Sequence, residues 1–381
     1  MNEERNGQSR SLLLSRRASR LRRFGSLVGH SLLFLVTAAS TVAVFFIFWF
    51  IIKDALPFFR LRGVTEFLTS TEWYPSREPA SFGALPLFYG SAMVTGGAVA
   101  VAVPLGVLAA VCLSDVLPFW VRQLVKPVIE ILAAIPSVAY GFFALVVFAP
   151  LLQEHGGVVL ATGTWVVGLP LAVLVLLLVG DAVSRRLPPQ RQLSGQLITS
   201  GSLAVLAAFG LYRLSAWLLH AEVISGANAL NVSVMLGIMA LPTVVSVSED
   251  ALQAAGRELR EASYALGATR VETIFRVIIP ASAGGICAAV ILGVMRAVGE
   301  TMVVWMASGN AAQIPHPFYN FLQPVRTMTA TIAGDMGEAD QVTGSARYHV
   351  LFALALCLLA FCFVANLVTE WVTRRAKAKL E

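Results

Sequence analysis

The sequence contains eight apolar runs, each about twenty residues or longer, and these runs limit the possible fold more than any other feature. A helix needs about 20 apolar residues to cross the roughly 30 Å hydrocarbon core of a bilayer. Only 13% of the 381 residues are charged and 57% are hydrophobic, whereas about 25% of a soluble domain is charged. The sequence therefore predicts an all-α polytopic membrane protein with about eight transmembrane helices. The runs are 31–52, 87–113, 128–152, 158–180, 197–219, 228–247, 281–306 and 349–371.

Lysine and arginine lie mainly on one side of this arrangement. With the N-terminus inside, 20 of the 28 basic residues fall in inside segments and six in outside segments, so the positive-inside rule predicts cytoplasmic N- and C-termini in a plasma or inner membrane. The first run is too long for the core of a signal peptide, and we expect a retained span. The expected units are a basic cytoplasmic tail attracted to anionic lipid (1–30), a first span with its external loop (31–86), a transmembrane domain (87–371) and a cytoplasmic tail (372–381).

Several classes of protein are disfavoured by what the sequence lacks. The four cysteines and five histidines show no zinc-like spacing, so we expect no metal site. No H-E-x-x-H motif or comparable nucleophile and base indicates a catalytic residue. The basic residues lie at the ends of the apolar runs, as membrane topology requires, which argues against nucleic acid as a partner. Because no G-x-x-x-x-G-K-[ST] segment is present, we expect no nucleotide cofactor in this chain.

A charged segment, 249–280, precedes the seventh run and is expected to lie in the cytosol. Its first part is typical of a short helix that ends at Gly267 in the left-handed conformation. Thr269 and Glu272 match a capping box, which predicts a second helix. Pro280 is expected to interrupt that helix where the membrane begins. The pattern predicts a helix, a turn and a helix across the cytosolic face, and an amphipathic surface loop is the alternative.

The seventh run carries two charged residues inside the membrane, Arg296 and Glu300. Uncompensated charge is costly there, and a functional role is the default interpretation. A spacing of four residues predicts that the two side chains share one face of one helix. The alternative is a static ion pair that holds two helices together.

The spacing in the charged segment resembles the EAA loop of ABC importer permeases, E-A-x-x-x-x-G followed by apolar-x-apolar-P. In that family the loop is the coupling helix, which sits in a groove on the ATPase subunit. Ser263, Val277 and Ile279 stand where alanine, isoleucine and leucine are usual, and all three are mild changes of size. The resemblance assigns ATPase coupling to Glu261, Ala262, Gly267 and Pro280.

The segment RAVGET at 296–301 resembles the R-A-x-G-E-T signature of phosphate importer permeases, and further stretches resemble their PstC-type subunit. The resemblance implies the type I importer permease fold. PstC-type permeases usually carry six helices, so the extra pair between about 158 and 219 is expected to be an insertion into a six-helix core. The further stretches are 82–91, 104–106, 126–145 and 327–339.

The resemblance implies that this chain is the membrane-spanning permease subunit of an ATP-driven importer of inorganic phosphate. It also implies a heterodimer with a second related permease, a pair of ATPase subunits that bind ATP and Mg, and an external phosphate-binding protein. A permease for another oxyanion, or the sister PstA-type subunit, is the alternative within the importer class. A secondary transporter is the alternative from another class, although the sequence shows no inverted repeat.

The same resemblance places substrate binding at Arg296, Glu300 and Thr301. A guanidinium is permanently charged and can bind phosphate through two parallel hydrogen bonds. Glu300 is expected either to neutralise Arg296 between turnovers or to accept the hydrogen of a protonated phosphate. Thr301 either donates its hydroxyl to the anion or bonds its own backbone.

Other features of the runs receive structural interpretations. Glu130 is expected to form a surface ion pair with Lys126, one helical turn earlier. Arg213 is expected to snorkel towards the membrane surface. Pro136 is expected to kink the third span. The loop at 307–348 is expected to lie at the outer mouth and to contact the binding protein.

Overall fold

The computed structural model describes residues 16–184, 192–338 and 345–377. Nearly all of this part is helical, which confirms the all-α expectation. Expectations for 1–15, for Arg185, Arg186 and Arg191, for 339–344 and for 378–381 lie outside the described residues. The long helices are α1 (Arg16–Arg62), α3 (Leu85–Val111), α4 (Phe119–Ala134), α6 (Ala149–Ser184), α7 (Gln192–Leu218), α8 (Ala229–Ala254), α11 (Ile279–Val298) and α14 (Ala346–Lys377).

Shorter elements connect these helices. Two strands, β1 (Trp73–Tyr74) and β2 (Ser81–Phe82), pair in antiparallel fashion. The short α-helices are α2 (Val64–Thr69), α5 (Ser137–Phe143), α9 (Gly256–Ala265), α10 (Arg270–Thr273), α12 (Met302–Ala307) and α13 (Met328–Asp335). Three π-helical segments extend neighbouring helices, namely η1 (Cys112–Val116), η2 (Ala144–Phe148) and η4 (Ile274–Ile278).

Seven helices of the described chain are long and apolar enough to cross a membrane, compared with the eight expected runs. The difference lies in the third and fourth runs, whose helices join across a kink at His155 and count as one span. The third run is broken at Ile135 and Pro136, whose ψ angles of 126° and 139° are extended, so the disturbance expected at Pro136 is confirmed as a complete break. From Ser137 the chain is then helical through α5, η2 and α6.

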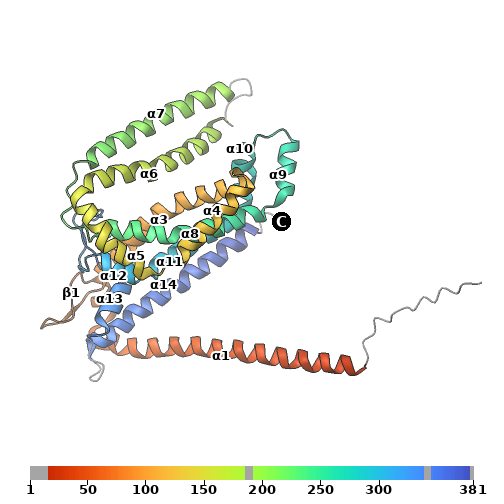
Figure 1. The fold of residues 1–381 in the computed structure, drawn as a ribbon. Helices are drawn as coiled ribbons and strands as arrows, with labels where there is room; N and C mark the ends of the chain where they lie inside the picture. Colours follow the sequence, from red (N-terminus) through yellow and green to blue (C-terminus); the bar gives the residue numbers. More distant parts are fainter. Residues whose placement is uncertain (1–15, 185–191, 339–344, 378–381) are drawn as a thin grey trace, which may run out of the picture.

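Residues 153–157, which separate the third and fourth apolar runs, lie within α6, where two helical stretches join across a kink. The helix changes direction there at His155, whose φ and ψ are −125° and 27°. Close packing explains the bend: a Cβ on Gly157 would lie 2.2 Å from the Leu219 carbonyl oxygen. The segment after α7 thus approaches the backbone of α6 directly. The expected insertion forms an antiparallel pair, α6 and α7, along one edge of the bundle (Figure 1).

The centre of the bundle is built from α3, α8 and α11. Val244 of α8 is fully buried between two glycines, Gly106 of α3 and Gly293 of α11. A Cβ on either glycine would lie 2.7 Å from a methyl carbon of Val244. Small residues at such contacts let membrane helices approach closely and gain van der Waals contact. The three helices are therefore locked together at one level of the bundle.

Helix α1 meets the rest of the molecule only near its C-terminal end (Figure 1). It begins at Arg16, so the second half of the expected N-terminal tail is helical. Towards its other end, Ala55 and Phe58 pack into a cluster with Phe67, Phe82 and the first turns of α14. The ends of α1 and α14 that face away from this cluster lie on the same side of the view as α9 and α10. This placement is consistent with both termini on one side of a membrane.

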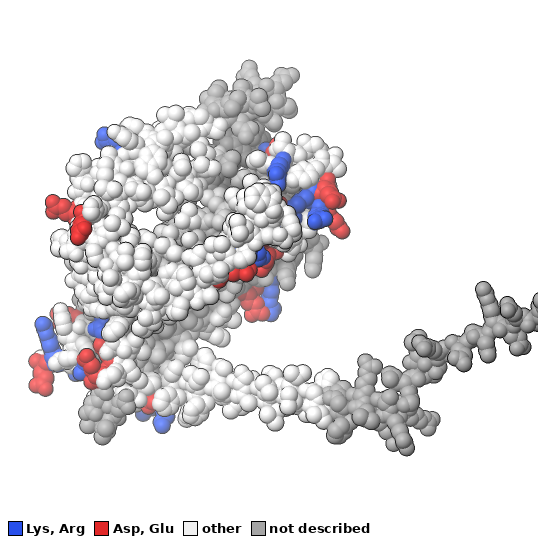
Figure 2. Space-filling view, in the orientation of Figure 1, with Lys and Arg blue, Asp and Glu red and all other residues white. Residues whose placement is uncertain are grey.

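Charge follows the same division. Figure 2 shows Lys, Arg, Asp and Glu gathered around α9 and α10 at one end and around β1 and α13 at the other, with a mostly uncharged band between them. Charged side chains avoid the hydrocarbon layer because desolvation is expensive. The two charged ends therefore mark the two faces of a multi-pass membrane protein.

The aromatic cluster gives a test of this packing. Phe58 is fully buried and makes edge contacts with Phe59, Phe67 and Phe82 at centroid distances of 5.5–5.6 Å. We expect Phe58→Ala to destabilise the fold by about 3–5 kcal/mol, because it removes a ring and leaves a cavity. Thermal unfolding of the purified protein measures this loss. Phe45→Ala, on the same helix but 70% exposed, should leave the melting temperature almost unchanged, and equal effects of the two changes would contradict the packing described here.

Candidate functional site

The residues of the seventh run lie at a break between two helices. Helix α11 ends at Val298, and α12 begins at Met302. Arg296 lies in the last turn of α11, whereas Glu300 lies in the break. The prediction that both residues share one helix face is therefore wrong. Its physical reason is local, because Gly299 ends the helix one residue before Glu300.

Glu300 has a structural partner in the break. Its Oε1 accepts the backbone N–H of Met302 at 3.1 Å and that of Val303 at 3.5 Å. These N–H groups open α12 and have no partner inside the helix. The Thr329 hydroxyl donates to the Glu300 backbone oxygen at 2.8 Å. Glu300 thus caps α12, and no ion pair joins it to Arg296, both residues being in the described part of the chain.

Arg296 keeps most of its binding capacity. Among the described residues its hydrogen bond goes to Thr243 of α8, from Nη1 to Oγ1 at 3.2 Å. A guanidinium has five N–H donors, and a neutral hydroxyl does not compensate its charge. The side chain is half-buried. Arg296 is therefore a partly desolvated cation that can still bind an anion.

Hydroxyl groups surround the break. A narrow crevice beside Glu300 includes Ser91 and Thr95 of α3 together with Thr327 and Thr329. The Ser91 hydroxyl accepts the Met328 N–H at 3.0 Å, and the two threonine hydroxyls lie 3.1 Å apart. None of these hydroxyl residues was expected at the site from the sequence, although Thr327 and Thr329 lie in the 327–339 stretch that carries the family resemblance. Their hydroxyl groups, inside a stretch that carries the family resemblance, were the sequence feature that could have indicated a polar site.

Thr301 opens α12 as its N-cap residue, with φ −115° and ψ −51°. Its carbonyl oxygen accepts the Trp305 N–H at 2.9 Å. Its hydroxyl makes no hydrogen bond to a described residue and forms no side-chain cap. Of the two alternatives for Thr301, bonding to its own backbone does not occur in this structure.

Residues 256–280, called the coupling segment below, have the expected helix, turn and helix. Gly267 has φ +82°, the left-handed conformation that ends a helix. The capping box is present in full, since Glu272 and Thr269 exchange side-chain and backbone hydrogen bonds. Ser263 stands where the family usually has alanine, and the structure gives its hydroxyl a role. The buried hydroxyl lies 2.9 Å from that of Thr273 and joins α9 to α10.

Pro280 does not interrupt the second helix, contrary to expectation. It lies in the first turn of α11, directly after η4. Proline lacks an N–H and disturbs an ordinary α-helical turn before it. In η4 the hydrogen bonds reach one residue further, as from the Ile279 N–H to the Ile274 oxygen. The helix therefore continues from Arg270 to Val298.

The turn of the coupling segment presents apolar side chains to solvent. Leu266 is 89% exposed, and Tyr264 and Val271 are also exposed. Glu261, Ala262 and Gly267 lie on the same exposed part of the chain. Pro280 is exposed as well but lies apart from the turn. Such a group of exposed apolar side chains is a candidate surface for contact with another protein.

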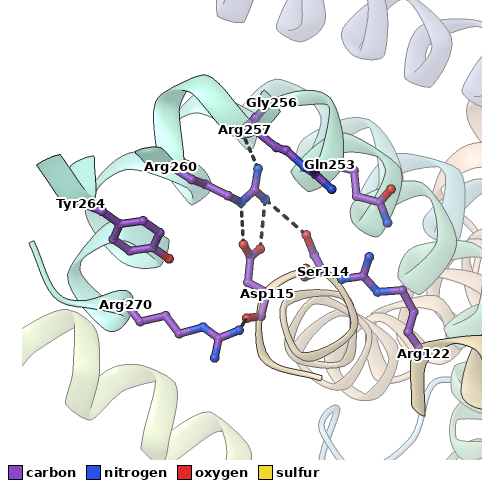
Figure 3. A pocket seen from close by; sticks show the side chains of 9 residues that line it. All are labelled: Ser114, Asp115, Arg122, Gln253, Gly256, Arg257, Arg260, Tyr264 and Arg270. Carbon is purple, nitrogen blue, oxygen red and sulfur yellow. Dashed lines mark hydrogen bonds and ion pairs between the residues drawn. The ribbon is translucent and has the colours of Figure 1, made fainter. Parts of the chain in front are cut away.

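A buried ion pair attaches the coupling segment to the bundle (Figure 3). Asp115, in η1 at the end of α3, accepts from Arg260 of α9 through both carboxylate oxygens, at 2.7 Å and 3.2 Å. Arg260 also donates to the backbone oxygens of Gly256 and Leu252 at 2.7 Å and 3.0 Å. Arg270 of α10 donates to the Asp115 backbone oxygen. This pair has no signal in the sequence, because no local pattern links two residues that lie far apart in the chain.

Among the described residues, Lys126 forms its ion pair with the buried carboxylate of Glu249 and not, as was expected, with Glu130. Its Nζ lies 3.2 Å from Glu249 and 3.7 Å from Asp250, both in α8. Glu249 is almost fully buried, so the pair fastens α4 to α8. Glu130, the expected partner, makes no ion pair with Lys126 in the described chain.

Comparison with known proteins gives consistent matches. The family described as binding-protein-dependent transport system inner membrane component matches residues 102–378. The chain is 30% identical over 346 residues to the probable ABC transporter permease protein YqgH of Bacillus subtilis, covering 90% of this chain and 88% of the relative. It is 30% identical over 313 residues to the phosphate transport system permease protein PstC of Mesorhizobium japonicum, covering 82% and 79%. For the PstC protein of Haemophilus influenzae the identity is 29% over 331 residues, covering 86% of each.

The Asp115–Arg260 pair generates a prediction about stability. Their side chains are only 8% and 17% exposed, and Asp115→Asn would leave the guanidinium buried without its counter-charge. We expect a loss of about 3–5 kcal/mol, measured as a lower melting temperature of the purified protein. Glu370→Gln, which breaks the exposed pair with Arg374, should cost about 0–1 kcal/mol. Equal melting temperatures for Asp115→Asn and wild type would show that the buried pair does not hold the coupling segment.

Proposed function

Since the chain belongs to the family of binding-protein-dependent transport system inner membrane components, we propose that it is the permease subunit of an ATP-driven importer of inorganic phosphate. The several relatives named as phosphate transport system permease proteins support this substrate. The observation that carries the proposal is the α11–α12 break, which presents Arg296 as a cation with one neutral partner. A permanently charged, partly desolvated guanidinium in a membrane protein suits an oxyanion.

Arg296, Thr301 and Glu300 divide the binding of phosphate between them. Arg296 supplies the charge and two parallel N–H donors. Thr301 supplies a hydroxyl that makes no hydrogen bond to a described residue. Glu300 is held by its Oε1 at the start of α12, and its other carboxylate oxygen accepts the hydrogen of a protonated phosphate. Sulfate lacks that hydrogen at neutral pH, so Glu300 favours phosphate over sulfate.

ATP hydrolysis takes place on a partner subunit. ATP and Mg bind to a pair of ATPase subunits, and the exposed turn around Leu266 docks on them. Glu261, Ala262 and Gly267 belong to this contact, whereas Pro280 sets the start of α11 at the membrane surface. The exposed apolar side chains of the turn support this role, because they have no cover within the described chain.

The proposal includes the remaining parts of the assembly. A second related permease lies alongside and completes the pathway, and an external phosphate-binding protein delivers substrate to the end that contains β1 and α13. The termini and the coupling segment face the cytoplasm. The common side of α9, α10 and the outer ends of α1 and α14 supports this orientation, as does the distribution of basic residues.

Arg296→Lys tests the substrate site, because it keeps the charge but removes the planar fork. We expect uptake of radiolabelled phosphate to fall at least about tenfold, the effect of losing one charge-assisted hydrogen bond. The measurement uses cells that lack the wild-type protein and express each variant at an equal membrane level. Thr243→Val removes only the neutral partner of Arg296 and should reduce uptake much less.

Two outcomes would count against this site. Full uptake by both Arg296→Lys and Arg296→Ala would reduce Arg296 to a structural residue. Equal competition by sulfate and phosphate in wild-type cells would exclude the proposed discrimination by Glu300.

Leu266→Asp tests the docking surface. We expect the variant to lose association with the ATPase subunits, because it places a charge in an apolar contact. Co-purification of the ATPase with the tagged chain measures the association. Ile224→Asp is the matched control, since Ile224 is 91% exposed but lies in the loop between α7 and α8, away from the turn. Normal co-purification with Leu266→Asp would place the ATPase contact elsewhere.

A further inference from the structure

The cytosolic end of the bundle contains a second feature that neither substrate binding nor ATPase docking explains. A cavity of about 370 Å³ lies between η1, α4, α8 and the coupling segment. Four arginines line it, Arg122, Arg257, Arg260 and Arg270, against a single carboxylate, that of Asp115. Figure 3 shows these side chains around the ion pair. The lining thus has an excess of three positive charges.

Within the described residues, only one of these four charges has a counter-charge. Arg260 is paired with Asp115. Arg122 and Arg270 donate to backbone oxygens, Arg122 to that of Leu113 at 2.6 Å. Carbonyl groups satisfy hydrogen bonds but carry no net charge. A cleft lined by one sign of charge concentrates ions of the opposite sign.

Arg257 is exposed and has its guanidinium donors available for a ligand. It lies on α9 at the edge of the cavity and makes no hydrogen bond or ion pair with a residue that the structure describes. Gln253, Tyr264 and Ser114 add neutral polar groups to the same lining. Guanidinium groups bind phosphate-type oxyanions with paired, charge-assisted hydrogen bonds. The chemistry of the lining therefore suits a compact anion with several oxygen acceptors.

We propose that this cavity is a cytosolic binding site for a phosphate-type oxyanion, either free inorganic phosphate or the phosphate of a lipid headgroup. The site is separate from Arg296 and does not depend on which substrate the protein transports. A bound anion joins Arg122 of α4 to Arg257 and Arg270 of the coupling segment. It therefore adds a second bridge beside the Asp115–Arg260 pair and holds the coupling segment more firmly against the membrane-spanning helices.

The test is equilibrium binding of radiolabelled inorganic phosphate to the assembled transporter, without nucleotide, in nanodiscs of zwitterionic lipid. Every protein in the series carries Arg296→Ala, so that phosphate bound at the proposed substrate site does not contribute to the measurement. The result therefore tests the cavity separately from the proposed substrate site. We expect saturable binding that Arg257→Gln weakens at least about tenfold. Arg257 makes no bond to a described residue, so its replacement should leave the melting temperature unchanged. Arg257→Gln combined with Arg270→Gln should abolish binding.

Arg374→Gln is the matched control, because Arg374 is an exposed arginine near the same end of the molecule, paired with Glu370. It should bind phosphate as the parent protein does. A second set of nanodiscs contains phosphatidic acid. Loss of phosphate binding only in these discs would identify the lipid headgroup as the occupant, and unchanged binding would identify the free anion.

Two results would overturn the proposal. One is that the parent protein does not bind phosphate, or that it binds phosphate no better than the variant lacking both Arg257 and Arg270. The other is dissociation of the ATPase from the arginine variants without any phosphate binding by the parent protein, which would assign the cavity to an acidic group of the ATPase.

Discussion

Every backbone N–H and C=O within the hydrocarbon layer needs a partner, and this constraint determines how the helices of this protein can break. Pro136 has no N–H, so the Leu132 carbonyl lacks its normal helical donor. The Tyr140 hydroxyl donates to that carbonyl oxygen at 3.0 Å. At the second break the Glu300 carboxylate accepts from the first N–H groups of α12. Each break is thus maintained by a side chain that replaces a helical hydrogen bond.

The two breaks meet in space. Helix α5 follows the first and α12 the second, and Gly141 lets them touch: a Cβ there would lie 2.8 Å from the Met306 sulfur and 3.3 Å from the Met302 oxygen. Short half-helices inside a membrane bring backbone ends and polar side chains to its middle, where a continuous helix presents only its apolar surface. The polar crevice beside Glu300 is a consequence of this arrangement. Breaking the helices therefore provides the polar groups that an ion pathway requires.

The sequence predicted what depends on neighbouring residues. Long apolar runs predicted the helices, and the capping box at Thr269 and the left-handed Gly267 were both confirmed because their hydrogen bonds and dihedrals are local. The prediction that Arg296 and Glu300 share one helix face was wrong, since a spacing of four residues has meaning only if the helix continues past Gly299. The Asp115–Arg260 pair had no local signal at all, because the two residues meet only after α3 and α9 have packed. Hydropathy separated two apolar runs at 153–157, where the chain bends at His155, but it could not show that the helical assignment continues through the bend.

The same rigid helices reach both sites. On α8, Thr243 bonds Arg296, and Gln253 lines the arginine-rich cavity ten residues later, about 15 Å along one helix. On α3, Ser91 lines the crevice, and Asp115 at the end of η1 holds Arg260 of the coupling segment. Val244, packed between Gly106 and Gly293, prevents these helices from sliding independently, because a well-packed contact transmits displacement rather than absorbing it. In the proposed mechanism, a movement of α11 when Arg296 binds or releases an anion is passed to α8 and α3 through this contact. The ends of these helices beside the coupling segment are joined to it through the Asp115–Arg260 pair, which is the route we propose for that movement.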